Sequence, residues 1–160
     1  MSLRHLLLNA AVAALYAALT IALAPVSYGP IQIRLSECMT LLAFYGGHWI
    51  PGLVAGCFLA NLGSPFGLTD ILVGTFATFI SVYTMRFCRN LFTAALCPVI
   101  ANGILIGAEL LYLAEIPADP VSVILTPVYI AAGEFVAVGI VGPVLFRILL
   151  KNPVIESYIK

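Results

Sequence analysis

Residues 6–24 read LLLNAAVAALYAALTIALA, and this stretch decides the class of fold. It contains no charged residue, and its length is close to the ~20 residues that a helix needs to cross a bilayer. Across the 160-residue chain 62% of residues are hydrophobic and 9% are charged. Soluble domains have roughly 45–50% apolar and about 25% charged residues. We therefore expect a membrane protein, in which residues 6–24 form a transmembrane helix rather than a cleaved signal peptide.

Five further apolar segments follow, separated by Gly, Pro, Asn and charged residues. Together the six segments cover residues 6–24, 35–45, 52–61, 70–85, 91–112 and 121–150. The sequence thus predicts an all-α polytopic membrane protein with six transmembrane helices, in which residues 1–160 form a single integral membrane domain. Segments two and three are short, since ~10–12 residues span only roughly 15–18 Å of about 30 Å of hydrocarbon. They are interpreted as broken helices beside a substrate site, as a re-entrant pair, or as segments that extend slightly further.

Charge distribution predicts the orientation. With a cytoplasmic N-terminus, six alternating segments place six of the seven basic residues inside, which satisfies the positive-inside rule and puts both termini in the cytoplasm. Arg34 is the exception. The outer half also collects five of the seven acids: Glu37, Asp70, Glu109, Glu115 and Asp119. An acidic outer face favours a cationic ligand or one rich in hydrogen-bond donors.

Several classes of function are disfavoured. The sequence has no G-x-x-x-x-G-K-[ST] loop for ATP phosphates. His5 and His48 both fall on the predicted inner side, away from the acids, so we expect no catalytic residue, metal site or cofactor. The four cysteines lack a C-x-x-C pair and are interpreted as packing residues. Seven basic and seven acidic residues cancel, which argues against binding to nucleic acid.

Polar residues within the apolar segments are the candidates for ligand binding, because burying them in lipid is costly. Asn102 and Glu109 are seven residues apart and share a helix face, with Tyr112 close by. Glu134 lies in the middle of the sixth segment. For Glu109 and Glu134, the alternative to ligand binding is a structural role, as a hydrogen-bonded or protonated acid.

The first predicted outer loop adds further candidates. Glu37 has a structural explanation in the helix dipole, with Ser36 as the N-cap. Arg34 has none, and we expect it to pair with Glu37 or to present its planar guanidinium to a ligand. Asn61 ends the third segment and Asp70 opens the fourth, where Asp70 is equally explained as an N-terminal helix charge.

Alanines recur at strict four-residue spacing in the first segment, at Ala10, Ala14, Ala18 and Ala22. Such a stripe lets another helix approach closely in lipid. The partner is either a helix of this protein or a second protein, and the pattern alone does not separate the two.

Two stretches resemble a known family: residues 24–37, APVSYGPIQIRLSE, and residues 56–70, GCFLANLGSPFGLTD. Together with the six-segment layout and the alanine stripe, they are similar to the QueT family, the substrate-binding S components of energy-coupling factor (ECF) transporters assigned to queuosine precursors. The resemblance implies a multi-pass protein of the bacterial cell membrane that docks on a transmembrane coupling protein carrying two ATPase subunits. It also implies that the alanine stripe meets the coupling protein.

The resemblance further implies a 7-deazaguanine ligand. Its N1–H and exocyclic amine present two donors to a carboxylate, while its carbonyl and ring acceptor suit Arg, Gln or Asn. The substrate-binding candidates are then Gln32, Arg34, Glu37, Asn61, Asp70, Asn102, Glu109, Tyr112 and Glu134. The alternatives are an S component for another small ligand, such as a vitamin or an aromatic amino acid, a structural membrane assembly protein, and a membrane enzyme.

Overall fold

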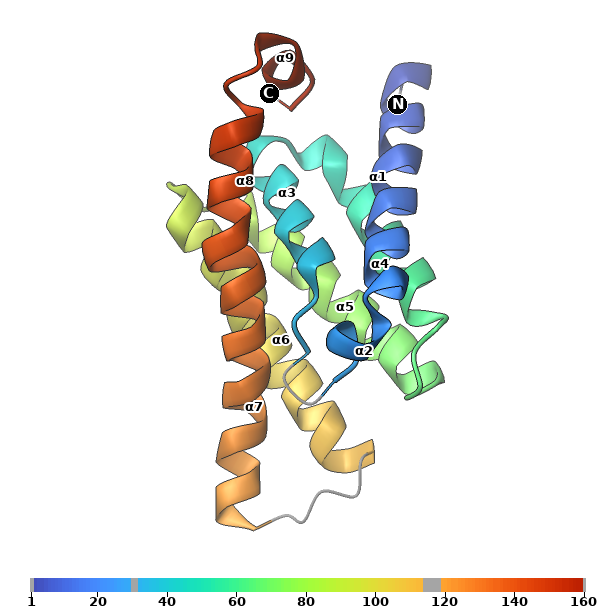
Figure 1. Cartoon of the computed structure of the whole chain (residues 1–160), viewed down its shortest axis with the longest axis vertical. Helices are drawn as coiled ribbons and strands as arrows, with labels where there is room; N and C mark the ends of the chain where they lie inside the picture. Colours follow the sequence, from blue (N-terminus) through green and yellow to red (C-terminus); the bar gives the residue numbers. More distant parts are fainter. Residues whose placement is uncertain (1, 30–31, 114–118, 160) are drawn as a thin grey trace.

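The computed structural model describes residues 2–29, 32–113 and 119–159, and every element in these ranges is helical (Figure 1). The α-helices are α1 (Leu3–Ala22), α2 (Ala24–Ser27), α3 (Leu42–Tyr45), α4 (Ile50–Asn61), α5 (Leu68–Met85), α6 (Leu91–Leu113), α7 (Pro120–Glu134), α8 (Gly142–Leu149) and α9 (Pro153–Ile159). Two 3₁₀ helices, η1 (Leu35–Leu41) and η2 (Gly47–Trp49), and one π-helix, η3 (Phe135–Val141), complete the described part.

The prediction of an all-α fold is confirmed for the described residues. Within the part of the chain that the structure describes, four helices are long and apolar enough to cross a membrane: Leu3–Ala22, Leu68–Met85, Leu91–Leu113 and Pro120–Leu149. The last is a run of 30 residues that joins α7, η3 and α8. Residues 35–45 form a shorter apolar helix, and α4 has 12 residues, so the two segments predicted to be short are short. A count of six crossings stays a prediction.

Close packing of α1 on α4 relies on two glycines of α4. A Cβ at Gly56 would lie 2.8 Å from Cβ of Tyr16 and 3.1 Å from Cα of Ala13, so only glycine allows this approach. At Gly52, the backbone N–H donates to Oδ1 of Asn9 at 2.6 Å. The packing buries the α1 face that carries Ala13 and Ala17 and leaves another face exposed, with Ala10, Ala14, Ala18 and Ala22.

Helices α6 and α7 pack closely in the same way. A Cβ at Gly107 would lie 2.8 Å from Cα of Pro127, and one at Gly103 would lie 3.0 Å from Cβ of Ala131. This approach lets Asn102 donate from Nδ2 to Oε1 of Glu134 at 2.7 Å.

The short helix η1 lies at the centre of the molecule. It follows Arg34, runs for seven residues, and packs against α1, α5, α6, η3 and α8. A 3₁₀ run of this length is uncommon and marks a constrained or functional segment. Every residue from Ser36 to Leu41 is buried, so the polar side chains of η1 point into the protein. The start of α1 and helix α9 lie at the same end of the molecule (Figure 1).

Candidate functional site

Eight of the nine predicted binding residues are buried, each with 6% or less of its surface exposed. They come from the loop before η1, from η1 itself, and from α4, α5, α6 and α7. Tyr112 differs, because 83% of its surface is exposed near the end of α6. The structure therefore gathers eight candidates in the interior and leaves Tyr112 apart.

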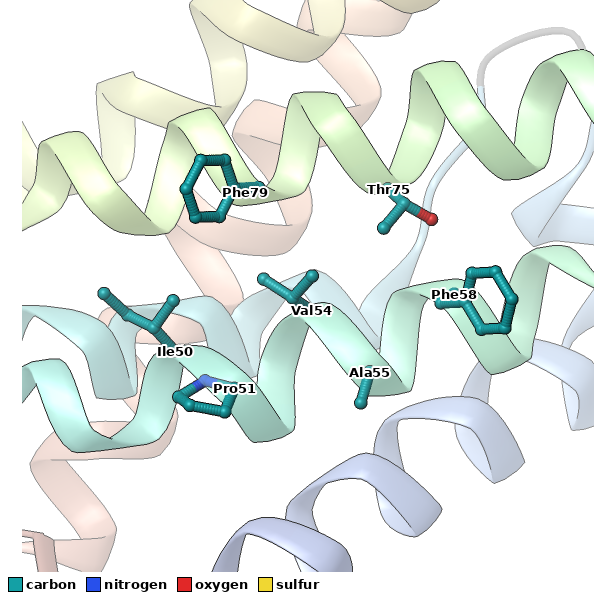
Figure 2. A pocket seen from close by; sticks show the side chains of 7 residues that line it. All are labelled: Ile50, Pro51, Val54, Ala55, Phe58, Thr75 and Phe79. Atoms are coloured by element: carbon teal, nitrogen blue, oxygen red, sulfur yellow. The ribbon is translucent and has the colours of Figure 1, made fainter. Parts of the chain in front are cut away.

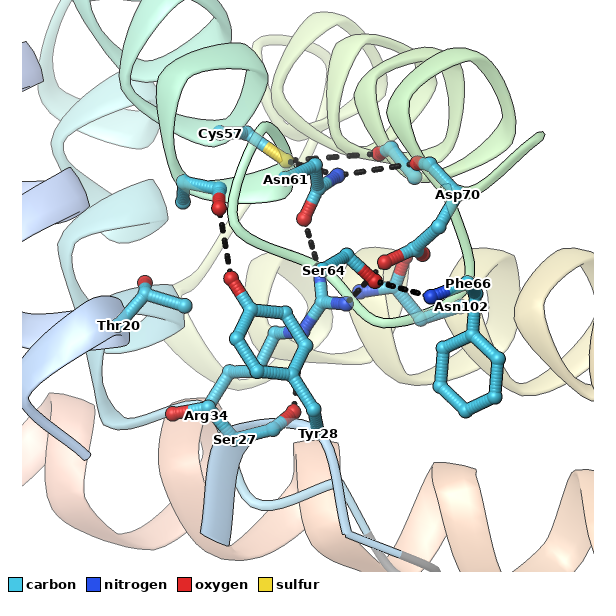
Figure 3. Close-up of polar contacts among 12 residues, drawn as sticks. Thr20, Ser27, Tyr28, Arg34, Cys57, Asn61, Ser64, Phe66, Asp70 and Asn102 are labelled. Atoms are coloured by element: carbon cyan, nitrogen blue, oxygen red, sulfur yellow. Dashed lines mark hydrogen bonds and ion pairs between the residues drawn. The ribbon is translucent and has the colours of Figure 1, made fainter. Parts of the chain in front are cut away.

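Arg34 ties three elements together (Figure 3). Its Nη1 donates to Oδ1 of Asn61 at 3.1 Å, and its Nη2 forms an ion pair with Oδ2 of Asp70 at 3.5 Å. Its Nε donates to the carbonyl of Ser27 at 3.4 Å, and its guanidinium lies 5.4 Å from the ring centroid of Tyr28. Arg34 thus pairs with Asp70 rather than with Glu37, because its extended backbone before η1 directs it toward α4 and α5.

Asn61 completes this arrangement, which we call the arginine network: Arg34, Asn61, Asp70, Ser27 and Tyr28. The Nδ2 of Asn61 donates to the carbonyl of Asp70 at 3.1 Å. The hydroxyl of Tyr28 donates to the carbonyl of Ala60 at 2.7 Å. The network joins α2, the loop before η1, the end of α4 and the start of α5, so it fixes the turn that contains Gly67, whose φ is +69°.

A second group of polar side chains surrounds Glu37. Its Oε1 accepts a short hydrogen bond from the hydroxyl of Tyr16 and a second from Oγ1 of Thr78 at 3.4 Å. Its Oε2 is buried and has no partner among the residues that the structure describes. One carboxylate oxygen is therefore held by α1 and α5, and the other has no described partner that accounts for its burial.

Two further buried acids also keep oxygens without partners in the described ranges. In Glu134, Oε1 accepts from Asn102 and Oε2 is unpartnered. In Glu109, both carboxylate oxygens are buried and unpartnered. We call Glu37, Glu109 and Glu134 the open carboxylates. Buried polar atoms normally have partners, so each of these four oxygens needs an explanation, and a ligand supplies one.

The open carboxylates come from three elements of the helical bundle. Glu37 lies on η1, Glu109 on α6 and Glu134 at the end of α7. Helix η1 packs against α6 and η3, and α6 packs against α7, so the acids come from neighbouring elements. Buried acids in an apolar interior attract hydrogen-bond donors and cations.

Gln32, in the loop before η1, is a further candidate with an unpartnered polar atom. It is 3% exposed, and its Nε2 is buried without a partner within the part described. Its φ of +48° lies in the left-handed region, which is costly for a residue with a Cβ. A strained, buried amide without a partner points to a functional constraint.

Other parts of the molecule are less suited to a polar ligand. Helices α4 and α5 border a groove of about 460 Å³ lined by Ile50, Pro51, Val54, Ala55, Phe58, Thr75 and Phe79 (Figure 2). None of the nine candidates lines it. Asp119 is exposed and caps α7 by accepting from the backbone N–H groups of Val121 and Ser122, and Glu115 lies outside the described residues. Within those residues no group of three His, Cys, Asp or Glu side chains is placed to hold a metal ion.

Sequence reasoning missed the two residues that hold Glu37. Tyr16 lies fully buried on α1, three residues after the buried Ala13. This spacing places both residues on one helix face and could have indicated that Tyr16 points inward. Thr78 on α5 carries no comparable signal, because threonines are common on apolar helices and its partner is 41 residues away.

Comparisons with known proteins match most of the chain to a family of transporters. The family model of the QueT transporter matches residues 6–151. Over 84 residues the chain is 40% identical to the queuosine precursor transporter QueT of Lactococcus lactis subsp. cremoris (strain MG1363). The aligned part covers 50% of this chain and 49% of that relative, so the chain matches about half of its length. No solved structure matches the chain.

Proposed function

Because this chain belongs to the QueT transporter family and has several helices of membrane-spanning length, we propose that it binds a queuosine precursor of the 7-deazaguanine type inside the membrane. Membership of a transporter family implies transport rather than catalysis. In the proposal, residues 1–160 act as one substrate-binding membrane domain with six crossings and both termini in the cytoplasm. The relative from Lactococcus lactis supports the substrate class by its name.

The observation that carries the proposal is the set of buried oxygens without partners on Glu37, Glu109 and Glu134. A 7-deazaguanine offers a matching set of donors. Its N1–H and exocyclic amine form an edge that one carboxylate accepts through both oxygens, which suits Glu109 because both of its oxygens are open. The unpartnered Nε2 of Gln32 is a donor for the ring carbonyl.

An aminomethyl group on the deazaguanine would carry a positive charge and would favour a second acid. Glu37 and Glu134 each have one open oxygen and one oxygen held by the protein. A partly held carboxylate is fixed in orientation, which lowers the entropy cost of binding a cation. We therefore propose Glu109 for the guanine edge and Glu37 or Glu134 for the ammonium group.

Isothermal titration calorimetry on the purified protein tests the ligand, with 7-aminomethyl-7-deazaguanine, 7-deazaguanine, a vitamin and an aromatic amino acid as probes. We expect the aminomethyl compound to bind most tightly and 7-deazaguanine more weakly. If the vitamin or the amino acid bound more tightly than both deazaguanines, its compound class would replace the deazaguanines as the proposed substrate. Failure of every probe, from protein that is folded and monodisperse, would favour a structural assembly role.

The proposal extends to an ECF-type arrangement, in which a separate coupling protein and two ATPase subunits drive transport. The sequence contains no phosphate-binding loop of its own. The stripe Ala10, Ala14, Ala18 and Ala22 is exposed on α1, while Ala13 contacts Gly56 of α4 and Ala17 is buried. Exposure favours a second protein as the partner of the stripe, since small residues allow close approach of helices.

Co-purification with a coupling protein and its ATPase subunits tests this extension. We expect Ala14→Phe to abolish recovery of the complex while ligand affinity is unchanged, because the larger ring prevents close helix contact. Leu15→Phe is the matched control, since Leu15 is exposed on the same helix but off the stripe. Equal recovery of both variants would argue against the stripe as the interface.

A further inference from the structure

A polar cleft lies where the first turn of α1 meets η2 and α9. It has a volume of about 170 Å³ and is lined by Arg4, His5, Leu8, His48, Ser157 and Tyr158. None of these residues belongs to the open carboxylates or to the arginine network. The cleft differs in chemistry from the apolar groove of Figure 2, because five of its six lining side chains carry polar groups.

Arg4 brings a positive charge to the cleft. The guanidinium of Arg4 lies 4.5 Å from the ring centroid of Tyr158. No acidic residue lines the cleft. These features favour an anion.

Two imidazole rings supply hydrogen-bond donors beside the guanidinium. The rings of His5 and His48 have centroids 5.1 Å apart. Nδ1 of His5 bonds to Oγ of Ser2 at 2.9 Å, which leaves Nε2 for a ligand. Asn9 fixes the backbone of His48 by donating to its carbonyl at 2.9 Å, and no hydrogen bond to the His48 ring is recorded within the described chain.

Other ligand classes fit less well. A metal ion would find two imidazoles but no third ligand among the described residues, and it would be repelled by Arg4. A whole metabolite needs more room, because small-molecule sites have volumes of about 300–1,000 Å³. A compact anion matches both the volume and the donors. Arginine favours phosphate in particular, because its planar guanidinium donates to two oxygens at once.

We propose that this cleft binds a phosphate group through Arg4, His5 and His48. A phospholipid headgroup and free phosphate are the two sources of this chemistry. The cleft lies at the start of α1, beside the apolar run that begins at Leu6, at the level where headgroups meet a transmembrane helix. Basic pockets between membrane helices are known to accept anionic headgroups.

Thermal unfolding of delipidated protein in a neutral detergent tests the proposal. The probes are dioleoylphosphatidylglycerol, dioleoylglycerol, which has the same acyl chains without phosphate, and inorganic phosphate. For the wild type, we expect phosphatidylglycerol to raise the unfolding midpoint by about 2–4 °C at saturation and dioleoylglycerol to leave it unchanged. Each shift is measured from the ligand-free midpoint of the same variant, so a change in basal stability does not affect the result.

The variants Arg4→Gln and His48→Gln assign the effect to the cleft. We expect each variant to bind the stabilising phosphate probe about tenfold more weakly than the wild type. Arg4→Gln loses a charged hydrogen bond, and His48→Gln displaces a hydrogen-bond donor. Arg147→Gln is the control, since it removes an exposed arginine that does not line the cleft.

The outcomes separate the sources and the alternatives. A shift with phosphatidylglycerol alone identifies a lipid headgroup, and a shift with inorganic phosphate alone identifies free phosphate. No shift with either probe overturns the proposal, as does a shift that Arg4→Gln and His48→Gln leave unchanged. Affinity for the deazaguanine is expected to be equal in all four proteins, which separates this cleft from the proposed substrate site.

Discussion

The arginine network and the open carboxylates lie close together in the interior but differ in how their polar atoms are satisfied. Arg34 contacts Ser27, Asn61 and Asp70, and Asn61 in turn contacts the backbone of Asp70. Glu109 contacts no partner within the described residues, and Glu37 and Glu134 each use one oxygen of two.

The difference separates two roles that composition alone does not distinguish. A buried charge with partners holds elements together, and loss of one partner leaves the other uncompensated. A buried oxygen without a partner costs free energy unless something binds it. We infer that the arginine network fixes the ends of α4 and α5 and that the open carboxylates serve the ligand. Changes in the first region should mainly affect stability, and changes in the second should mainly affect binding.

The largest expected effect is on stability, from Arg34→Met. Methionine fills similar volume without charge, so Asp70 would remain buried without its ion-pair partner. Breaking a buried pair in this way costs about 3–5 kcal/mol. Chemical unfolding in detergent, followed by tryptophan fluorescence, measures the loss. Arg86→Met is the control, because Arg86 is exposed, and it should change stability by less than about 1 kcal/mol. If Arg34→Met were as stable as the wild type, the network would have no structural role.

The next effect is on ligand binding, from Glu109→Gln and Glu134→Gln. The amide keeps the shape of the side chain but removes the charge, and Glu134→Gln keeps an oxygen to accept from Asn102. We expect affinity for the aminomethyl deazaguanine to fall about 10- to 100-fold in calorimetry for Glu109→Gln, and for Glu134→Gln where Glu134 rather than Glu37 receives the ammonium group, because hydrogen bonds to a charged group are lost. Folding stability should change by less than about 1 kcal/mol, since a neutral amide is easier to bury.

Tyr112→Ala is the control for these two variants, because its ring is 83% exposed. We expect its ligand affinity to equal that of the wild type. A large loss on Tyr112→Ala, with unchanged affinity in both acid variants, would reverse the assignment and return Tyr112 to the site.

The smallest expected effect comes from Gln32→Gly. Glycine adopts the left-handed φ of +48° without strain, so stability should change by less than about 1 kcal/mol. Loss of the Nε2 donor should weaken ligand affinity about tenfold in calorimetry. Gln32→Asn separates the contribution of the backbone conformation from that of the amide donor, because asparagine tolerates this backbone and keeps an amide. Binding by Gln32→Gly at wild-type affinity would remove the amide from the site.

Much of the fold was predictable because apolar runs and their breaks define membrane helices. Residues 35–45 were predicted as a short helix and form one, although its first part is a 3₁₀ helix. The sequence did not indicate which alanines pack inside, since Ala13 and Ala14 are chemically identical. The contact between Gly56 and Ala13 decides this, and it joins residues far apart in the chain.

The candidate residues were predictable as a set but not in their pairing. Scarcity of charge makes Arg34 and the buried acids conspicuous in an apolar chain. Arg34 is paired with Asp70, which is 36 residues away, and Tyr16 takes the place beside Glu37. Such pairs depend on how helices pack, and helix periodicity relates only residues within one helix.

The continuous helix Pro120–Leu149 has a consequence for the surrounding lipid. Its 30 residues extend roughly 45 Å at ~1.5 Å per residue, against about 30 Å of hydrocarbon, whereas the 18 residues of α5 extend roughly 27 Å. One molecule thus presents both a helix that exceeds the hydrocarbon thickness and one that barely reaches it. Tilting and protrusion into the headgroup layer accommodate the first, while local thinning accommodates the second. Where both helices cross the bilayer, their lengths favour different local thicknesses of hydrocarbon, and the stability of the protein is expected to depend on acyl chain length.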